Sequence, residues 1–202
     1  MCKMFLMSNS SIKSVSEFVV DVLETAVIAL SIFIIIYLLA FQPHEVNGQS
    51  MDGIDNFHNG QLILTDKLSY RFKEPQRGEV IVFKYPLNKS YDYIKRIIGL
   101  PGESIMLVDN QIYIYNSEFP EGKIIDESLY IGENVLTQGR AFLGEAQKIT
   151  ISDDSYFVMG DNRPESSDSR TWGFVPRKNI IGRSYFRYWP PNQIGLIKHQ
   201  SF

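Results

Sequence analysis

The run from Thr25 to Phe41 carries no charged residue, and it limits what this chain can form more than any other feature. Extended back to Phe18, the apolar stretch reaches the ~20 residues that a membrane-spanning helix needs. The segment Ser31–Tyr37 is apolar on every face of a helix, which argues against a core helix with one buried stripe. Pro43 then disfavours helix at the residue before it. The sequence therefore predicts a transmembrane anchor over residues 18–41.

A cleavable signal peptide is the alternative interpretation of this stretch. The run is long for that purpose, and Leu38–Ala40 lacks a small residue at the first position of an A-x-A-like cleavage site. We therefore expect an uncleaved, single-pass anchor in the cell membrane. Lys3 and Lys13 precede it, and the positive-inside rule then places residues 1–17 in the cytoplasm and residues 42–202 on the extracytoplasmic side.

The composition excludes several classes of protein. The chain has 202 residues, with 20 basic and 23 acidic side chains, and a net charge of −3 does not suggest a nucleic-acid partner. The only cysteine is Cys2, so the part after the anchor can form neither a disulfide nor a thiolate nucleophile. Three histidines, His44, His58 and His199, lack metal-ligand spacing. We expect no metal and no cofactor.

After the anchor the pattern changes to short strands. Strand-length runs rich in β-branched and aromatic residues occur at Leu62–Leu64, Glu79–Phe83, Tyr93–Ile98, Ser104–Val108, Ile112–Tyr115, Tyr156–Met159 and Gly182–Trp189. Asp109 and Asn110 tolerate a positive φ and predict a hairpin turn. Residues 116–147 are less regular and predict an insertion on the sheet. We expect a mainly β domain of antiparallel sheets over residues 42–202.

Ser50 is the first residue that could carry chemistry. It stands in Gly48-Gln49-Ser50-Met51, only a few residues after the apolar run. Serine is a weak nucleophile until a base removes its proton and donors hold the oxyanion. Glycine at 48 lets the backbone approach a substrate carbonyl closely. Taken alone this motif is weak, because most serines in turns are structural.

Lys95 lies in a strongly apolar strand and is the candidate base. Strand alternation puts it on one face with Tyr93, and puts Arg96 on the other face with Ile94. One of the two cations must point into apolar surroundings if either face packs. A buried lysine loses hydration, which favours the neutral amine. The alternative is an edge strand with both charged heads reaching solvent.

The loop from Gly160 to Pro176 collects small hydroxyls and charges after a strand. A hydroxyl from Ser166 could orient a neutral lysine. Asp168 and Arg170 could pair and brace the loop. Trp172 argues that the segment packs against the domain, although a solvated turn is the simpler interpretation.

Together these stretches resemble the type I signal peptidases, which are membrane-anchored serine proteases of family S26. The matching pieces follow the family's order. They are the anchor, Gly48–Met51, Gly78–Lys84, Tyr93–Glu103, Gly160–Arg163, Ser166, Asp168–Arg170 and Trp172–Pro176. The resemblance implies a signal peptidase or LexA-like fold of coiled antiparallel β-sheets. It also implies an endopeptidase that removes signal peptides from exported pre-proteins after A-x-A-like sites.

The resemblance also implies roles for single residues. Ser50 would be the nucleophile and Lys95 the general base. Ser166 would hydrogen-bond the lysine amine, and Asp168 with Arg170 would brace the site. Two further residues, Met51 and Ile94, would line the pocket for the small substrate side chain.

This sequence departs from the family pattern at two places. The family usually reads S-M-x-P-T, whereas Asp52 is followed here by Gly53-Ile54-Asp55, and the path to Gly60 is about two residues longer. Gly48 stands where many members carry a hydroxyl donor for the oxyanion, so a second donor has to come from elsewhere.

Two other functions compete with signal-peptide cleavage. Self-cleavage by the same dyad, as in LexA-type repressors, has no support because an anchor replaces any DNA-binding segment. A catalytically impaired, membrane-anchored peptide-binding module is the other alternative, and only the altered segment Gly53–Asp55 supports it.

Overall fold

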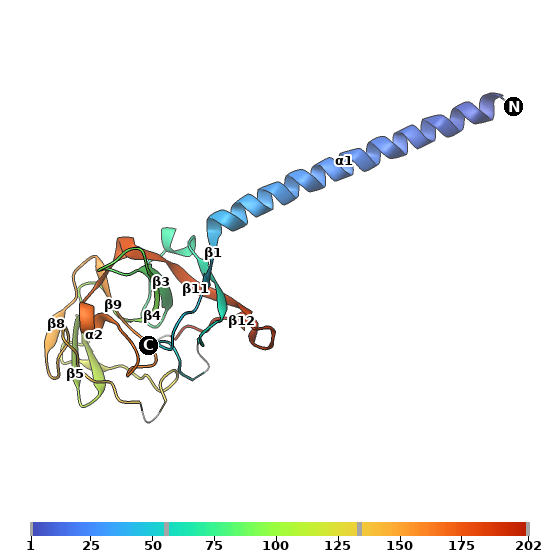
Figure 1. The fold of residues 1–202 in the computed structure, drawn as a ribbon. Coiled ribbons are helices and arrows are strands. Elements are labelled where there is room, and N and C mark those ends of the chain that lie inside the picture. Colours follow the sequence, from blue (N-terminus) through green and yellow to red (C-terminus); the bar gives the residue numbers. More distant parts are fainter. Residues whose placement is uncertain (1, 55–56, 133–134, 201–202) are drawn as a thin grey trace. The chain divides into compact units, whose positions relative to one another are not determined.

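The computed structural model describes residues 2–54, 57–132 and 135–200. The chain divides into two compact units, Met1–Ala40 and Phe41–Phe202. The first unit is a helix and the second is a β domain, as the ribbon in Figure 1 shows. The expected fold class is therefore confirmed.

Helix α1 spans Cys2–Ala40 and makes up the first unit. Within it, the 26 residues of Val15–Ala40 are long and apolar enough to cross a membrane. At 1.5 Å per residue they extend ~39 Å, more than the ~30 Å hydrocarbon core of a bilayer. The hydroxyls of Thr25 and Ser31 donate to carbonyls four residues earlier, at 2.8 and 2.7 Å. These two hydroxyls are thereby paired within the helix.

The helix ends at Ala40, because Phe41 opens a strand. β1 (Phe41–Glu45) pairs antiparallel with β2 and stands at the end of the main sheet. The sequence pattern gave no sign of β1, since Phe41–Glu45 does not alternate and contains Pro43. Proline is tolerated there because an edge strand leaves one row of backbone N–H groups without a ladder partner.

The main sheet has eight strands and runs in the order β1-β2-β11-β3-β4-β9-β10, with β12 paired to β11. The other bounds in this sheet are β2 Leu62–Asp66, β3 Val80–Lys84, β4 Asp92–Gly99, β9 Ser155–Met159, β10 Val175–Pro176, β11 Ile180–Trp189 and β12 Gly195–Leu196. All of these pairings are antiparallel. The expected strands in this part of the chain are present, with ends that shift by at most two residues.

A second sheet of four strands has the order β7-β6-β5-β8. Its bounds are β5 Ser104–Val108, β6 Gln111–Tyr115, β7 Lys123–Ile124 and β8 Lys148–Thr150. Asp109 and Asn110 join β5 to β6 with φ values of 50° and 64°, which confirms the predicted hairpin. The irregular residues 116–132 and 135–147 connect β6 to β8 and add only β7 to the sheet.

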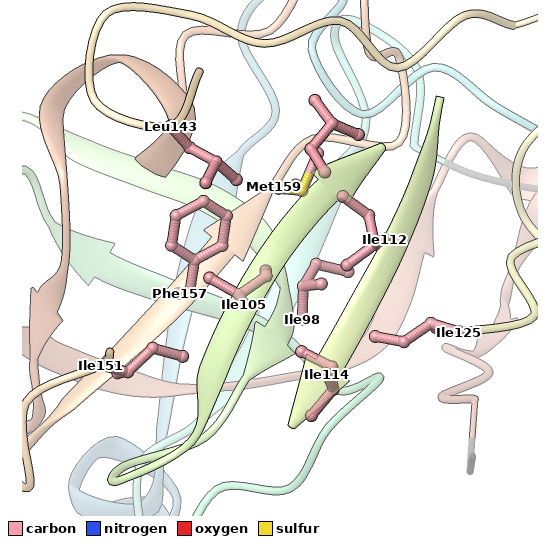
Figure 2. Packing of buried hydrophobic residues seen from close by; sticks show 10 residues of the cluster. Ile98, Ile105, Ile112, Ile114, Ile125, Leu143, Ile151, Phe157 and Met159 are labelled. Atoms are coloured by element: carbon pink, nitrogen blue, oxygen red, sulfur yellow. The ribbon is translucent and has the colours of Figure 1, made fainter. Parts of the chain in front are cut away.

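The largest apolar core lies where the two sheets meet. Figure 2 shows Phe157 and Met159 of β9 beside Ile105 of β5. Ile112 of β6 belongs to the same cluster and is fully buried. Leu143, from the irregular segment, closes one side of this core. The segment is therefore packed into the domain and does not hang free of it.

Short helical turns complete the β domain. α2 spans Ser169–Trp172, and 3₁₀ turns occupy Ser69–Arg71, Arg177–Asn179 and Pro191–Gln193. Asp168 caps α2 by accepting a bond from the backbone N–H of Arg170 at 3.2 Å. The longest helix in the described part of the domain is thus one turn, as the strand-rich sequence predicts.

Candidate active site

The turn that carries Ser50 is held from two sides. The Gly48 N–H donates to the side chain of Asn59 at 2.7 Å, and Gly48 itself has a φ of +93°, which favours glycine. From the opposite side, the Asn162 side chain donates to the Gln49 carbonyl at 3.0 Å, and the Asn162 N–H donates to the Ser50 carbonyl at 3.2 Å. The serine is therefore fixed by a loop that comes more than one hundred residues later in the sequence.

Gly160 explains how closely that loop approaches. A Cβ atom at this position would lie 2.3 Å from the Ser50 carbonyl oxygen and 2.2 Å from Ser166 Oγ. In the sequence, Gly160 begins the loop and belongs to the matching stretch Gly160–Arg163, but no pattern there indicated a close contact with Ser50. The structure shows that a side chain there would push the Ser50 turn away from its support.

Lys95 reaches Ser50 from β4. Its Nζ lies 2.7 Å from Ser50 Oγ and donates to the Ile94 carbonyl at 2.8 Å. The residue is 3% exposed. Burial lowers the pKa of Lys95 to about 8, and the charges of Asp168 and Asp161 oppose this shift only in part. The structure thus brings together the two residues that the sequence proposed as nucleophile and base.

Asp168 and Arg170 form the brace that the sequence expected. Arg170 Nε and Nη2 donate to the two carboxylate oxygens of Asp168 at 2.9 and 2.8 Å, and both side chains are buried. Asp168 also accepts from the Gly160 N–H at 3.2 Å. Although burial opposes it, the bond from Arg170 is one of the contacts that hold the pKa of Asp168 below its ordinary value. This pair fixes the end of the loop beneath the site.

Ser166 is fully buried beside this pair. Its hydroxyl oxygen has no hydrogen-bond partner within the described residues, although its proximity to Asp168 helps to lower the pKa of that carboxyl. Among the described hydrogen bonds, those of the Lys95 amine go to Ser50 and Ile94, and none joins it to Ser166. The expected bond between the serine hydroxyl and the amine therefore stays a prediction.

A groove of about 550 Å³ runs beside the Ser50–Lys95 pair. One wall is formed by His44 to Ser50 and the other by Ser90 to Lys95, with Ile63 and Val82 on its floor. Ile94 lines this groove, as expected. Met51 is 1% exposed and packs in the apolar cluster with Val82, so it supports the floor and does not line the groove.

A second set of buried charges lies next to the site and was not found from the sequence. Arg96 donates to both carboxylate oxygens of Asp161 at 2.9 and 2.6 Å, and to the Gly78 carbonyl at 2.8 Å. The ring of Tyr130 lies 4.2 Å from the guanidinium of Arg96. Alternation along β4 predicts which face of the strand carries Arg96, but nothing in the local sequence pattern identifies the partners of this side chain.

The irregular segment supplies several of these contacts. Glu127 pairs with the buried Arg163, and Tyr130 donates its hydroxyl to Glu127 at 2.6 Å. The hydroxyl of Thr137 accepts from Arg163 Nη1 at 2.7 Å, and Arg140 donates to the Pro164 carbonyl at 2.6 Å. Residues that looked like a variable insertion therefore hold the loop that supports Ser50.

The departure from S-M-x-P-T has a structural counterpart. Just before the positions where the family usually has proline and threonine, the N–H of Asp52 donates to the Gln49 carbonyl at 3.0 Å. Its carboxylate lies 2.9 Å from Nδ1 of His58. This exposed pair joins the beginning and the end of the longer path. In the described residues, no group of three or more His, Cys, Asp or Glu side chains could hold a metal ion.

The chain is similar to known proteins of one family. The family model described as "Signal peptidase, peptidase S26" matches residues 19–189. A probable signal peptidase I-2 of Synechocystis sp. is 38% identical over 69% of this chain and 59% of its own length. A probable signal peptidase I-1 of the same organism is 30% identical over 97% of this chain and 95% of its own length.

Further relatives come from other bacteria. Signal peptidase I of Bacillus caldolyticus is 33% identical over 84% of this chain and 91% of its own length. A crystal structure of a signal peptidase I from Enterococcus faecalis aligns with a TM-score of 0.41 and 31% identity, over 55% of this chain and 97% of that one. The family match covers most of the chain, and the chain therefore belongs to the signal peptidase family, peptidase S26, and is a serine peptidase.

Proposed function

We propose that this protein is a membrane-anchored signal peptidase in which Ser50 is the nucleophile and Lys95 the general base. In the reaction, the neutral amine of Lys95 takes the proton of the Ser50 hydroxyl while Oγ attacks the scissile carbonyl. The ammonium then gives that proton to the leaving amine as the peptide bond breaks and an acyl-enzyme forms. A water molecule, deprotonated by Lys95, hydrolyses the ester and restores Ser50.

The observation that carries this proposal is the 2.7 Å separation of Lys95 Nζ from Ser50 Oγ inside a buried site. With a pKa of about 8, about a tenth of the lysine is neutral at pH 7. An exposed lysine with its ordinary pKa of 10.5 would be neutral in fewer than about one molecule in a thousand. Burial therefore raises the fraction of Lys95 that is neutral at pH 7 by roughly two orders of magnitude.

The groove supports an extended substrate. In the described sheet, β1 pairs only with β2, so its other edge is open toward the groove. The first half of β4, Asp92–Lys95, pairs with β3, while the pairing of β4 with β9 begins at Arg96. Two open strand edges face one groove, and a peptide strand can add its backbone hydrogen bonds to such edges. Ile94 and Val46 both line this groove, and we expect them to limit the residue next to the cut to a small side chain.

The anchor and its orientation complete the proposal. We assign residues 1–17 to the cytoplasm, residues 18–41 to the membrane and residues 42–202 to the extracytoplasmic side, because Lys3 and Lys13 precede the span. Only residues 41–49 separate the helix from Ser50 in the sequence. The partners are then the lipid bilayer and the signal peptides of exported pre-proteins.

A cleavage assay on a pre-protein with an A-x-A-like site tests the dyad. Ser50→Ala, Lys95→Met and Lys95→Arg are each expected to lose at least about a thousandfold in rate, because each removes nucleophile or base. Arginine cannot replace the base, since its guanidinium stays protonated. The double variant Ser50→Ala/Lys95→Met should be no slower than either single variant.

The control is Lys178→Met, which removes an exposed lysine far from β4 in the sequence and should cleave at the wild-type rate. Mass spectrometry of the products locates the cut. Near wild-type cleavage by Lys95→Met would show that another group is the base.

A further inference from the structure

The groove beside Ser50 has two levels with different chemistry. Side chains two residues apart on a strand share a face, so His44 lies on the same side as Val46, and Asp92 on the same side as Ile94. All four line the groove, two on each wall. The level next to the Ser50–Lys95 pair is therefore apolar, and the level two residues further along is polar.

The two polar residues face each other across the groove. His44 Nε2 lies 3.5 Å from Asp92 Oδ2, and the two side chains are 13% and 24% exposed. This separation is longer than the 2.7–3.2 Å of a direct N–H···O hydrogen bond. The pair is thus close enough to attract but is not joined by a well-formed hydrogen bond.

Each partner has its own support behind the groove. His44 Nδ1 lies 2.9 Å from the hydroxyl of Thr65, and the Gln42 amide lies 3.2 Å from Nε2. Asp92 accepts from Lys84 Nζ at 2.7 Å. Burial lowers the pKa of His44, so its ring is neutral at pH 7. A neutral ring and a carboxylate are therefore held in fixed positions on opposite walls.

The register of a bound peptide places one side chain at each level. In an extended peptide, side chains two residues apart point the same way and lie ~7 Å apart. If the residue before the cut (position −1) sits against Val46 and Ile94, the residue at position −3 sits over the His44–Asp92 pair. The family resemblance assigns recognition to these same two positions.

We propose that His44 and Asp92 select the residue at position −3, and that they favour a hydroxyl side chain, threonine or serine, over an apolar one of the same size. This inference rests on the proposed function of the groove. A hydroxyl both donates and accepts, so it can donate to Asp92 and accept from His44, or donate to His44 when the ring proton is on Nδ1. An apolar side chain makes neither bond and removes water from both polar groups.

The test compares two peptides that differ only at position −3, one with threonine and one with valine, and both with alanine at −1. The full-length protein in detergent micelles is expected to cleave the threonine peptide with a kcat/KM about tenfold higher or more. His44→Leu and Asp92→Ala should each reduce this ratio to about one or below. Asp92 is exposed enough that its truncation leaves the fold intact.

The matched control is His58→Leu, which removes a histidine that does not line the groove. Its threonine-to-valine ratio should equal that of the wild type, whatever its absolute rate. Equal cleavage of both peptides by the wild type, or an unchanged preference in His44→Leu, would overturn the inference and leave the proposed function in place.

Binding measurements test the selection at position −3 separately from the proposed function, even if the wild type does not cleave the peptides. Ser50→Ala cannot form the acyl-enzyme, so fluorescence anisotropy with the same two peptides reports recognition alone. A tenfold tighter Kd for the threonine peptide, lost in Ser50→Ala/His44→Leu, supports the selecting pair even without turnover. Equal Kd values would contradict it, whereas absence of cleavage by the wild type would contradict only the proposed function.

Discussion

Lys95 and Arg96 are neighbours on β4, both are cations, and both are almost completely buried, at 3% and 1% exposure. Arg96 meets a carboxylate, since its guanidinium forms two bonds to Asp161 and a third to a backbone carbonyl. Within the described residues, the hydrogen bonds of the Lys95 amine go to neutral oxygens, those of Ser50 and Ile94. The difference shows that burial alone does not make a cation reactive. A buried cation without a carboxylate partner loses its proton more readily, and one with a partner holds the structure together.

The largest effect on stability is expected when the paired cation is removed. Arg96→Met leaves the carboxylate of Asp161 buried without its guanidinium, which typically costs about 3–5 kcal/mol. Chemical unfolding of the full-length protein in micelles measures this loss. Arg96→Met/Asp161→Leu removes both charges and should recover most of it. A loss below about 1 kcal/mol in the single variant would mean that the pair contributes little.

Removal of Lys95, the cation without a carboxylate partner, is expected to increase the stability of the protein. The pKa of Lys95 falls from its ordinary 10.5 to about 8, so the unfolded chain binds more protons than the folded one between these values. Folding of the wild type is therefore penalised by about 3 kcal/mol below pH 8, and the penalty disappears as the pH rises through 10.5. Lys95→Met loses ~1 kcal/mol of hydrogen bonding, and a net gain of about 2 kcal/mol at pH 7 remains.

Above pH 10.5, where the wild-type lysine is neutral in both states, this gain should disappear, and only the loss of ~1 kcal/mol from the missing hydrogen bonds should remain. Unfolding curves of the wild type and Lys95→Met at pH 7 and near pH 10.5 measure the difference. If the variant were less stable than the wild type at pH 7, burial of the protonated Lys95 amine would not destabilise the folded protein.

A smaller effect tests the role of the irregular segment, which contacts Arg96 through Tyr130. Tyr130→Phe keeps the ring that lies 4.2 Å from Arg96 but removes the hydroxyl bond to Glu127. We expect a loss of about 1 kcal/mol in stability and little change in cleavage rate. Tyr130→Ala, which also removes the ring, is the comparison and should lose more. A loss of activity in Tyr130→Phe greater than its loss of stability explains would extend the site into this segment.

The strands and the hairpin could be predicted from the sequence because their signals are local. Alternation and β-branched residues identify β4 and β9, and Asp109 with Asn110 identifies the turn between β5 and β6. β1 could not be predicted, because a short edge strand with Pro43 has no periodic pattern. Its presence depends on pairing with β2, which is a tertiary contact.

The candidate site was predictable in its chemistry and less so in its supports. The motif around Ser50 and the apolar strand around Lys95 point to the dyad, and the structure brings them together. Met51 follows the serine in the sequence, but the conformation of the turn directs the Met51 side chain into the apolar core. The partners of Arg96 come from loops that are distant in the sequence, so no local sequence pattern predicts them.

The most direct test of the contrast between the two cations is a titration of Lys95 itself. Full-length protein with ¹³C-labelled lysine side chains is followed by NMR in micelles from pH 6 to pH 11, and the signal missing from Lys95→Met identifies the residue. The account predicts that the Lys95 amine loses its proton with a midpoint near pH 8. A midpoint above pH 10 would contradict it, because the lysine would then be no better a base than one in water.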